Sequence, residues 1–261
     1  MEVRVEHLAG TDEGIVLLGL DRPAARNALG RQLLAELAQA LADLRADGGV
    51  RVVVLHSLVP GVFCAGADLK ERAGMDAAEA EAFVDGLRET FTQLEDLPMP
   101  VIAALEGAAF GGGLELALAA DLRVASVAAK LGLVETALAI IPGAGGTQRL
   151  PRLIGAARAK ELIFAARRIG AGEAERLGLL NRLVPEGQAL AAALSLAREI
   201  LPNGPVALRM AKTAISRGLD LDRDAALSLE RDCYAQILPT EDRAEGLAAF
   251  REKRTPRYRG R

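Results

Sequence analysis

Two glutamates, Glu115 and Glu135, are the candidates for acid–base chemistry in this chain. Each stands in an otherwise apolar stretch: Glu115 before the Leu- and Ala-rich run that ends at Asp121, and Glu135 within residues 131–141. A buried carboxyl group is costly without a task or a partner. Two enclosed carboxyls that converge on one water could divide the acid and base roles. Both also have plainer interpretations, as a first-turn acid favoured by the helix dipole and as an ion-pair partner.

A glycine run, Gly111-Gly112-Gly113, directly precedes Glu115 and lies between an expected strand and an expected helix. One interpretation is structural, because glycine lets a helix pack closely against a sheet where side chains would not fit. The other is functional, because the free N–H groups at a helix start attract negative charge on a ligand. The position of Glu115 in the first turn favours the functional interpretation.

Several other chemistries are not supported. The chain lacks the G-x-S-x-G elbow, the H-E-x-x-H motif and the phosphate-binding Walker loop. Its only histidines are His7 and His56, and His56 ends an expected buried strand, where a structural role is expected. The dinucleotide pattern G-x-G-x-x-G/A fails at both glycine-rich segments, because Leu116 and Gln148 occupy the last position. We therefore expect no metal and no cofactor.

Composition describes an ordinary globular chain of 261 residues, 51% of them hydrophobic, with a net charge of −3. That charge argues against whole-surface attraction to nucleic acid or anionic membrane. The two cysteines, Cys64 and Cys233, form no disulfide framework and suit a reduced compartment. No signal peptide or membrane span is expected. The expected location is the cytoplasm, or the mitochondrial matrix if a transit peptide has been removed.

Hydrophobic periodicity predicts an α/β core followed by helices. Apolar and β-branched runs predict strands at residues 14–20, 50–56, 101–105 and 122–125, with an extended segment at 131–136 and a loop at 142–146. Helical spacing predicts helices at 30–46, 76–97 with Asp76 as N-cap, 156–166, 171–177, 188–201, 205–217 and 225–236. We divide the chain into a core, residues 1–200, and a C-terminal helical region, residues 201–261.

Four stretches resemble successive signatures of the crotonase (enoyl-CoA hydratase/isomerase) superfamily. They are Phe63-Cys64-Ala65-Gly66-Ala67-Asp68-Leu69-Lys70, Gly111-Gly112-Gly113-Leu114-Glu115, Leu133-Val134-Glu135 and Ile141-Pro142-Gly143-Ala144-Gly145-Gly146-Thr147-Gln148-Arg149-Leu150. Their order and spacing agree with the superfamily over nearly the whole chain. The resemblance implies a crotonase-like spiral of ββα units, with a C-terminal helical region that forms trimers or dimers of trimers.

The resemblance also implies roles for individual residues. Backbone N–H groups of Ala67 and Gly112 would form an oxyanion hole for an acyl-CoA thioester, a device typically worth about 3 kcal/mol per donor. Glu115 matches the water-activating carboxylate, and Glu135 matches the proton donor to the α-carbon. Residues assigned to CoA, from the motifs and from the attraction between basic side chains and phosphate, are Arg26, Ala65, Asp68, Leu69, Lys70 and Lys253. Lys253 belongs to a basic tail, residues 251–261.

Within the superfamily the chain resembles the AU-binding enoyl-CoA hydratases, which are 3-methylglutaconyl-CoA hydratases, and the enoyl-CoA hydratase domain-containing proteins. The stretches that carry this likeness are Asp68-Leu69-Lys70-Glu71-Arg72, Ala159-Lys160-Glu161-Leu162-Ile163-Phe164, Cys233-Tyr234-Ala235-Gln236 and Phe250-Arg251-Glu252-Lys253-Arg254. The matching lysine-rich helix credited with RNA contact is absent here, since residues 39–51 carry only Arg45 and Arg51 against two aspartates. RNA binding is therefore not expected.

The leading hypothesis is a hydratase acting on an α,β-unsaturated acyl-CoA. An acyl-CoA isomerase, decarboxylase or thioesterase on the same scaffold is the second hypothesis, and an RNA-binding or scaffold protein with residual hydratase activity is the third. The closer likeness implies 3-methylglutaconyl-CoA, an intermediate of leucine degradation with a distal carboxylate. Its site needs a cation or several N–H donors at the far end of the pocket, because an unpaired buried carboxylate is costly.

Overall fold

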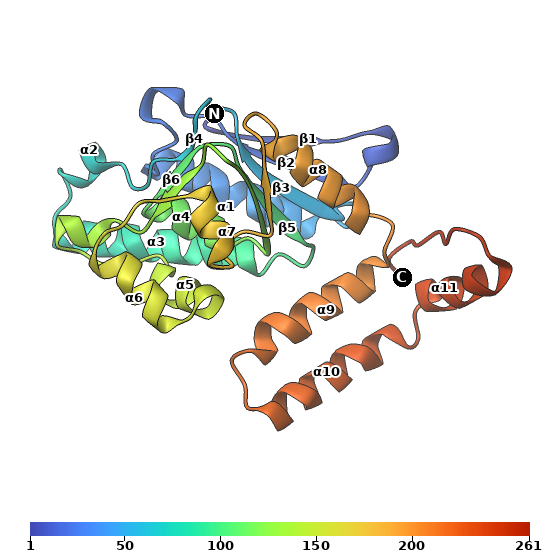
Figure 1. Cartoon of the computed structure of the whole chain (residues 1–261). Helices are drawn as coiled ribbons and strands as arrows, with labels where there is room; N and C mark the ends of the chain where they lie inside the picture. Colours follow the sequence, from blue (N-terminus) through green and yellow to red (C-terminus); the bar gives the residue numbers. More distant parts are fainter.

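A computed structural model describes residues 1–261 and contains two sheets (Figure 1). The larger sheet has the strand order β1-β2-β3-β5-β7-β10, and the smaller has the order β4-β6-β8-β9. The larger sheet contains β1 (Val3–His7), β2 (Ile15–Leu20), β3 (Val52–Ser57), β5 (Val101–Leu105), β7 (Leu122–Ser126) and β10 (Arg182–Val184). The smaller sheet contains β4 (Val62–Cys64), β6 (Ala108–Phe110), β8 (Lys130–Gly132) and β9 (Ile169–Gly170).

The chain repeats one step three times. β3 then β4, β5 then β6, and β7 then β8 each place the first strand in the larger sheet and the second in the smaller one. Helices follow each strand pair and return the chain to the larger sheet. Neighbouring strands contributed by successive steps pair in parallel, as such crossovers require. This arrangement confirms the predicted spiral of ββα units.

Side chains of the larger sheet alternate between two hydrophobic clusters, following the period of two in a strand. In β2, Val16, Leu18 and Leu20 join the main core of 46 buried residues. Ile15 and Leu17 point to the opposite face, against Ala193 of α8 (Ala189–Ile200). The central part of the sheet is therefore covered on both faces, which explains why β2, β3 and β5 are almost entirely apolar.

The helices of the core cover the two sheets, and the five that helical spacing predicted end near their predicted boundaries. The core helices are α1 (Arg31–Ala46), α2 (Leu69–Arg72), α3 (Ala77–Glu95), α4 (Gly112–Leu118), α5 (Gly146–Ile154), α6 (Ala156–Phe164), α7 (Ala171–Arg176) and α8. Asp76 caps α3 as predicted: its side chain accepts from the Glu79 N–H, and the Glu79 side chain accepts from the Asp76 N–H. This reciprocal capping box stops the helix start from fraying.

The C-terminal helices stand apart from the sheets. Figure 1 shows α9 (Pro205–Gly218) and α10 (Arg223–Ile237) as an antiparallel pair, followed by α11 (Glu241–Glu252). A half-buried ion pair ties α9 to the core, with 2.7 Å between Lys212 Nζ and Asp121 Oδ2. Large apolar side chains remain exposed on these helices, among them Ile215, Leu219 and Phe250, the last 84% exposed.

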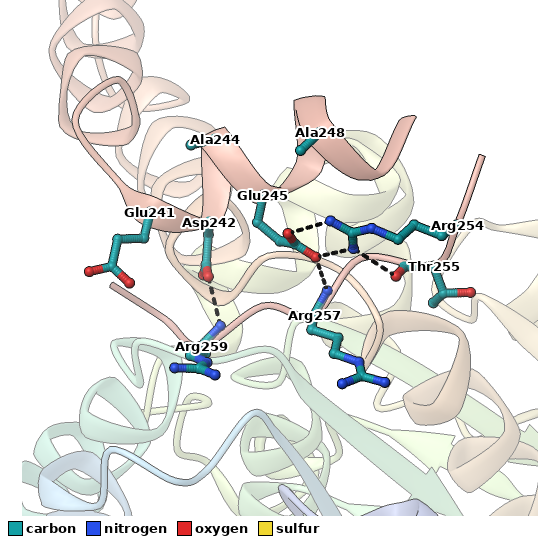
Figure 2. Close-up of a pocket in the computed structure, with 9 residues that line it drawn as sticks. All are labelled: Glu241, Asp242, Ala244, Glu245, Ala248, Arg254, Thr255, Arg257 and Arg259. Atoms are coloured by element: carbon teal, nitrogen blue, oxygen red, sulfur yellow. Dashed lines mark hydrogen bonds and ion pairs between the residues drawn. The ribbon is translucent and has the colours of Figure 1, made fainter. Parts of the chain in front are cut away.

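The basic tail folds back along α11, and its Lys and Arg side chains remain exposed to solvent (Figure 2). Asp242 accepts hydrogen bonds from the backbone N–H groups of Arg259 and Gly260. Glu245 accepts from the Arg254 guanidinium and from the Arg257 N–H. The hydrogen bonds from the Arg254 guanidinium, and then from the Arg257 N–H, lower the pKa of Glu245 to about 2. The hollow between α11 and the tail has nine lining residues, and none of them lines the cavity that holds Glu115 and Glu135.

Some elements differ from the sequence prediction. The extended segment expected at 131–136 ends at Gly132, and a 3-10 helix begins at Glu135 (Glu135–Leu138). The loop expected at 142–146 leads directly into α5, which interior Pro151 and several glycines conceal in the sequence. Helix α11 and strands β1 and β6 were also not expected. Strand β1 is mostly exposed and strand β6 has only three residues, so that the hydrophobic pattern of each is weak.

Candidate active site

The candidate site forms where three parallel strands of the smaller sheet end. Ala65 and Ala67 follow β4, the glycine run follows β6, and Glu135 follows β8 by three residues. Because β6 pairs in parallel with both β4 and β8, the carboxyl ends of all three strands lie at one edge. Crevices at such edges are the usual binding places in parallel sheets. Segments far apart in sequence are thereby brought together.

Each glycine of the run has a different reason to be glycine. Gly111 has φ of +52°, a conformation that favours glycine, and a methyl group there would lie 3.1 Å from Glu135 Oε1. Gly113 packs against β4, where a methyl group would lie only 2.3 Å from the Cys64 carbonyl oxygen. Gly112 faces the site. Close packing therefore accounts for Gly113, whereas Gly112 stays a candidate for ligand contact.

Two backbone N–H groups, those of Ala67 and Gly112, are free at this edge. The parallel bridge beside Ala67 uses the N–H groups of Leu29 and Asp68, so that the Ala67 N–H donates to no backbone acceptor. Gly112 is the first residue of α4, where an N–H has no intrahelical acceptor. A methyl group on Gly112 would lie 3.9 Å from both the Ala67 nitrogen and Glu115 Oε2. The two donors and one carboxylate thus border the same small volume.

Glu115 is buried, only 3% exposed, and its carboxylate is fixed on one side. Its Oε1 accepts hydrogen bonds from the N–H groups of Ala144, at 2.9 Å, and Gly146, at 2.7 Å. Burial raises the pKa of Glu115, while these two donors and the charges of Arg149 and Arg88 oppose the rise. Donors of this kind favour the ionised form and leave Oε2 available to the site.

Glu135 is in the opposite situation. Both of its carboxyl oxygens are buried, and neither has a hydrogen-bond partner. Burial first, and then the negative charge of Glu115, raise the pKa of Glu135 from 4.5 to about 7. The two carboxyls therefore cannot easily be ionised together. Because only Glu115 has N–H donors, a single shared proton belongs on Glu135 and the charge on Glu115.

A cavity of about 700 Å³ contains both glutamates, the two free N–H groups and Ala65. Of its 21 lining residues 12 are hydrophobic, including Val84 and Leu87 of α3 and Leu138, Ile140 and Ile141 of the segment before α5. An apolar pocket with a few converging polar groups and perturbed pKa values is the usual form of a small-molecule site. Its volume suits a ligand of considerable length.

The residues assigned to CoA fall into two groups. Ala65 and Leu69 line the cavity, Arg26 is beside it because its carbonyl accepts from the Ala65 N–H, and Lys70 is exposed on α2. Asp68 and Lys253, by contrast, do not line the cavity.

The Asp68 carboxylate already has a structural task. It accepts from the N–H groups of Lys70 and Glu71 at the start of α2 and forms an ion pair of 2.8 Å with Arg22. Lys253 ends α11, on the C-terminal helices that lie away from α2 in Figure 1. Ala65 and Leu69 therefore lie at the cavity, whereas the Asp68 side chain and Lys253 do not.

Sequence reasoning missed the amide groups of Ala144 and Gly146 and the cavity-lining Arg88. The motif around Gly143 was quoted for the family resemblance, but its hydrogen bonds to Glu115 depend on the turn into α5. In the sequence, Arg88 is one of several charged residues of the predicted helix 76–97, and no motif or spacing distinguishes it as a site residue.

Among the described residues, no group of three or more His, Cys, Asp or Glu is placed to hold a metal ion. No helix has the length and apolar character that crossing a bilayer requires.

The spiral of ββα units, with two carboxyls and two free N–H groups at the edge of its smaller sheet, matches one family. The family model for enoyl-CoA hydratase/isomerase covers residues 10–261, and the chain belongs to this family. The human mitochondrial methylglutaconyl-CoA hydratase is 53% identical over 99% of this chain and 78% of that protein. The human mitochondrial enoyl-CoA hydratase domain-containing protein 2 is also 53% identical, over 100% of this chain and 90% of that protein.

Solved structures agree with the fold. The crystal structure of an enoyl-CoA hydratase from Bacillus anthracis is 48% identical, with a TM-score of 0.97 over the whole of both chains. An enoyl-CoA hydratase from Geobacillus kaustophilus is 34% identical, with a TM-score of 0.94 over 100% of this chain and 97% of the other. The predicted superfamily, its fold and the closer likeness to methylglutaconyl-CoA hydratases are thereby confirmed.

Proposed function

We propose that the protein is a hydratase that adds water across the double bond of an α,β-unsaturated acyl-CoA, with Glu115 as base and Glu135 as acid. The observation that carries the proposal is the unequal environment of the two carboxyls. Glu115 has two N–H donors, whereas Glu135 has no partner and a pKa of about 7. Environments that push two carboxyl pKa values apart are the usual means of assigning acid and base roles.

In this mechanism the thioester oxygen accepts hydrogen bonds from the Ala67 and Gly112 N–H groups. These donors stabilise the negative charge that develops when the enoyl group becomes enolate-like. Ionised Glu115 removes a proton from water, and the resulting hydroxyl bonds to the β-carbon. Protonated Glu135 donates its proton to the α-carbon. Proton exchange from Glu115 back to Glu135 restores the starting state.

Isomerisation is the nearest alternative in this family, because it also proceeds through an enolate-like state. It moves one proton between two carbons and needs no water-activating base. The proposal of hydration therefore depends on Glu115 being ionised and able to reach a water through Oε2. The RNA-binding hypothesis has little support in the structure, because the two basic residues of segment 39–51 already have partners within the chain. Arg45 donates to the Asp96 carbonyl, and Arg51 donates to the Leu201 and Asn203 carbonyls.

The test is hydration of crotonyl-CoA, followed by the loss of its absorbance, for the wild type and for Glu115→Gln and Glu135→Gln. Each variant should lose about a hundredfold or more in kcat, the usual scale for a general acid or base. A matched control, Glu161→Gln, changes an exposed carboxylate of α6 that pairs only with Arg167 and should retain activity. Near-normal turnover of either site variant would remove that residue from the mechanism.

For the natural substrate we propose 3-methylglutaconyl-CoA, which places the enzyme in leucine degradation. The support is the likeness to methylglutaconyl-CoA hydratases at 53% identity and the presence of cations on the cavity wall. A general short-chain hydratase of fatty acid metabolism would prefer crotonyl-CoA. A tenfold preference for crotonyl-CoA in kcat/KM, about 1.4 kcal/mol, would argue against the leucine-pathway substrate and leave the hydratase proposal intact.

We further propose that the chain forms trimers or dimers of trimers. The C-terminal helices have more exposed apolar surface than a monomer normally retains, including Ile215, Leu219, Leu227, Tyr234 and Phe250. Helices α9 and α10 pack mainly against one another and contact the core at few places. Covering this surface with neighbouring copies would also bring additional basic groups of the tail near a second chain.

A further inference from the structure

Three arginines, Arg72, Arg88 and Arg168, line the cavity, and each lies on a different part of its wall. We propose that Arg88 is the specificity-determining residue that binds a distal carboxylate on the acyl group of the substrate. The inference deepens the proposed function and depends on it. It concerns the class of enoyl-CoA substrates in which a carboxylate follows the double bond by one carbon, as in glutaconyl-type acyl groups.

The Arg88 guanidinium contacts the loop that holds Glu115. Its Nε and Nη2 donate to the Gly143 carbonyl at 3.2 and 3.1 Å. The next amide of the chain, that of Ala144, donates to Glu115 Oε1 at 2.9 Å. With ordinary peptide bond lengths, this connection places the Arg88 guanidinium within about 9 Å of the Glu115 carboxylate.

The length of the acyl group fits this separation. Under the proposed mechanism Glu115 delivers water to the β-carbon, and a carboxylate two bonds further along extends about 4 Å from that carbon. Helix α3 presents Val84 and Leu87 on the same wall as Arg88, so that the carbon chain has apolar contacts before it reaches the charge. The wall therefore offers both apolar contacts and a positive charge, the two features that such an acyl group requires.

The Gly143 carbonyl and Asp85 occupy three of the five N–H groups of Arg88, which leaves one N–H on each Nη for a ligand. The Nη1 atom pairs at 2.6 Å with Asp85, but both side chains are more than half exposed, and such surface pairs are weak. A guanidinium has five N–H donors and binds carboxylates well in a two-point geometry. Burial raises the pKa of Glu115, and the charge of Arg88, after that of Arg149, opposes this rise. A substrate carboxylate near ionised Glu115 would be repelled, and Arg88 is placed to offset that repulsion.

The other two arginines are placed differently. The Arg168 guanidinium lies 5.0 Å above the Phe110 ring, at the start of β9 on the outer edge of the smaller sheet. Arg72 belongs to α2, directly after the Ala65–Leu69 segment assigned to CoA. Neither contributes to the pKa of Glu115 or Glu135. Arg168 is therefore the matched control: a cavity arginine with a different position.

The experiment compares two substrates of similar length, 3-methylglutaconyl-CoA with its carboxylate and hex-2-enoyl-CoA without charge. The measured quantity is the ratio of their kcat/KM values in the wild type, Arg88→Gln, Arg88→Lys and Arg168→Gln. Using the ratio cancels any general loss that arises because Arg88 also holds the Gly143 loop. Far-UV circular dichroism and light scattering check that each variant keeps its fold and assembly.

We expect Arg88→Gln to lower the ratio by about tenfold or more, the effect of losing a charge-assisted contact. Arg88→Lys should keep part of the preference, and Arg168→Gln should leave the ratio within about twofold of the wild type. An active enzyme whose ratio is insensitive to Arg88, or falls only in Arg168→Gln, would overturn this inference alone. A folded wild type that hydrates neither substrate would overturn the proposed function together with it.

Discussion

Replacing Glu135 with glutamine should remove activity and at the same time make the protein more stable. Both oxygens of Glu135 are buried without a partner, and its pKa is raised from 4.5 to about 7, by burial and by the charge of Glu115. This elevation corresponds to about 3 kcal/mol against the ionised form. The carboxyl oxygens are enclosed, but Glu135 as a whole residue is only half-buried, so that solvent screening reduces the value to about 2 kcal/mol.

The sign of the pH dependence follows from proton binding. Between pH 4.5 and 7 the folded protein holds a proton on Glu135 that the unfolded chain has released. Stability contributed by this group is therefore fully present below about pH 4.5 and is lost as the pH rises through about 7. Glutamine does not titrate. Glu135→Gln should be more stable than the wild type by about 2 kcal/mol at pH 8, and by about half of that at pH 5.5.

Equilibrium or thermal unfolding at pH 5.5 and pH 8, at one protein concentration because the assembly contributes, measures this difference. The exposed variant Glu161→Gln is the control and should differ from the wild type by less than about 1 kcal/mol at both pH values. If Glu135→Gln were less stable than the wild type at pH 8, or gained equally at both pH values, the burial argument for an elevated pKa would be refuted. A gain in stability with a loss of turnover is typical of a functional group held in an unfavourable environment.

Four further outcomes can be checked. In the wild type, kcat/KM for hydration should decline as the pH rises through about 7, because Glu135 loses its proton; a flat profile up to pH 9 would contradict its role as acid. Gly112→Pro deletes one free N–H and should abolish turnover, and light scattering must show intact assembly; a wild-type rate in a folded variant would exclude this donor. Gly113→Ala should destabilise the fold by about 1–3 kcal/mol, because its methyl group would meet the Cys64 carbonyl oxygen at 2.3 Å, whereas Gly172→Ala in α7, with no close neighbour, should be neutral or stabilising. Light scattering at micromolar concentration should give a trimer or a dimer of trimers, and a monomer would refute the assembly.

The sequence by itself determined the elements with strong local signals. Strands β2, β3, β5 and β7 of the larger sheet are short, mainly apolar runs, and α1 and α3 have clear helical spacing, with a capping box at Asp76. The glycine run and the two glutamates were also visible, because carboxyls in apolar stretches are unusual. Weak local signals failed: α5 contains Pro151, and the short strand β6 follows β5 with little sequence between them.

Only the tertiary structure decided what the candidate site residues do. Glu115 and Glu135 are 20 positions apart, and they converge because β6 and β8 end at the same edge of one sheet. The difference between them comes from the Ala144 and Gly146 amides, which reach Glu115 through the turn into α5 and leave Glu135 without a donor. A pKa depends on burial and on the groups nearby in space, and neither can be read from the residues adjacent in the sequence. For the same reason, the position of Arg88 on the cavity wall could not be predicted from its place in α3.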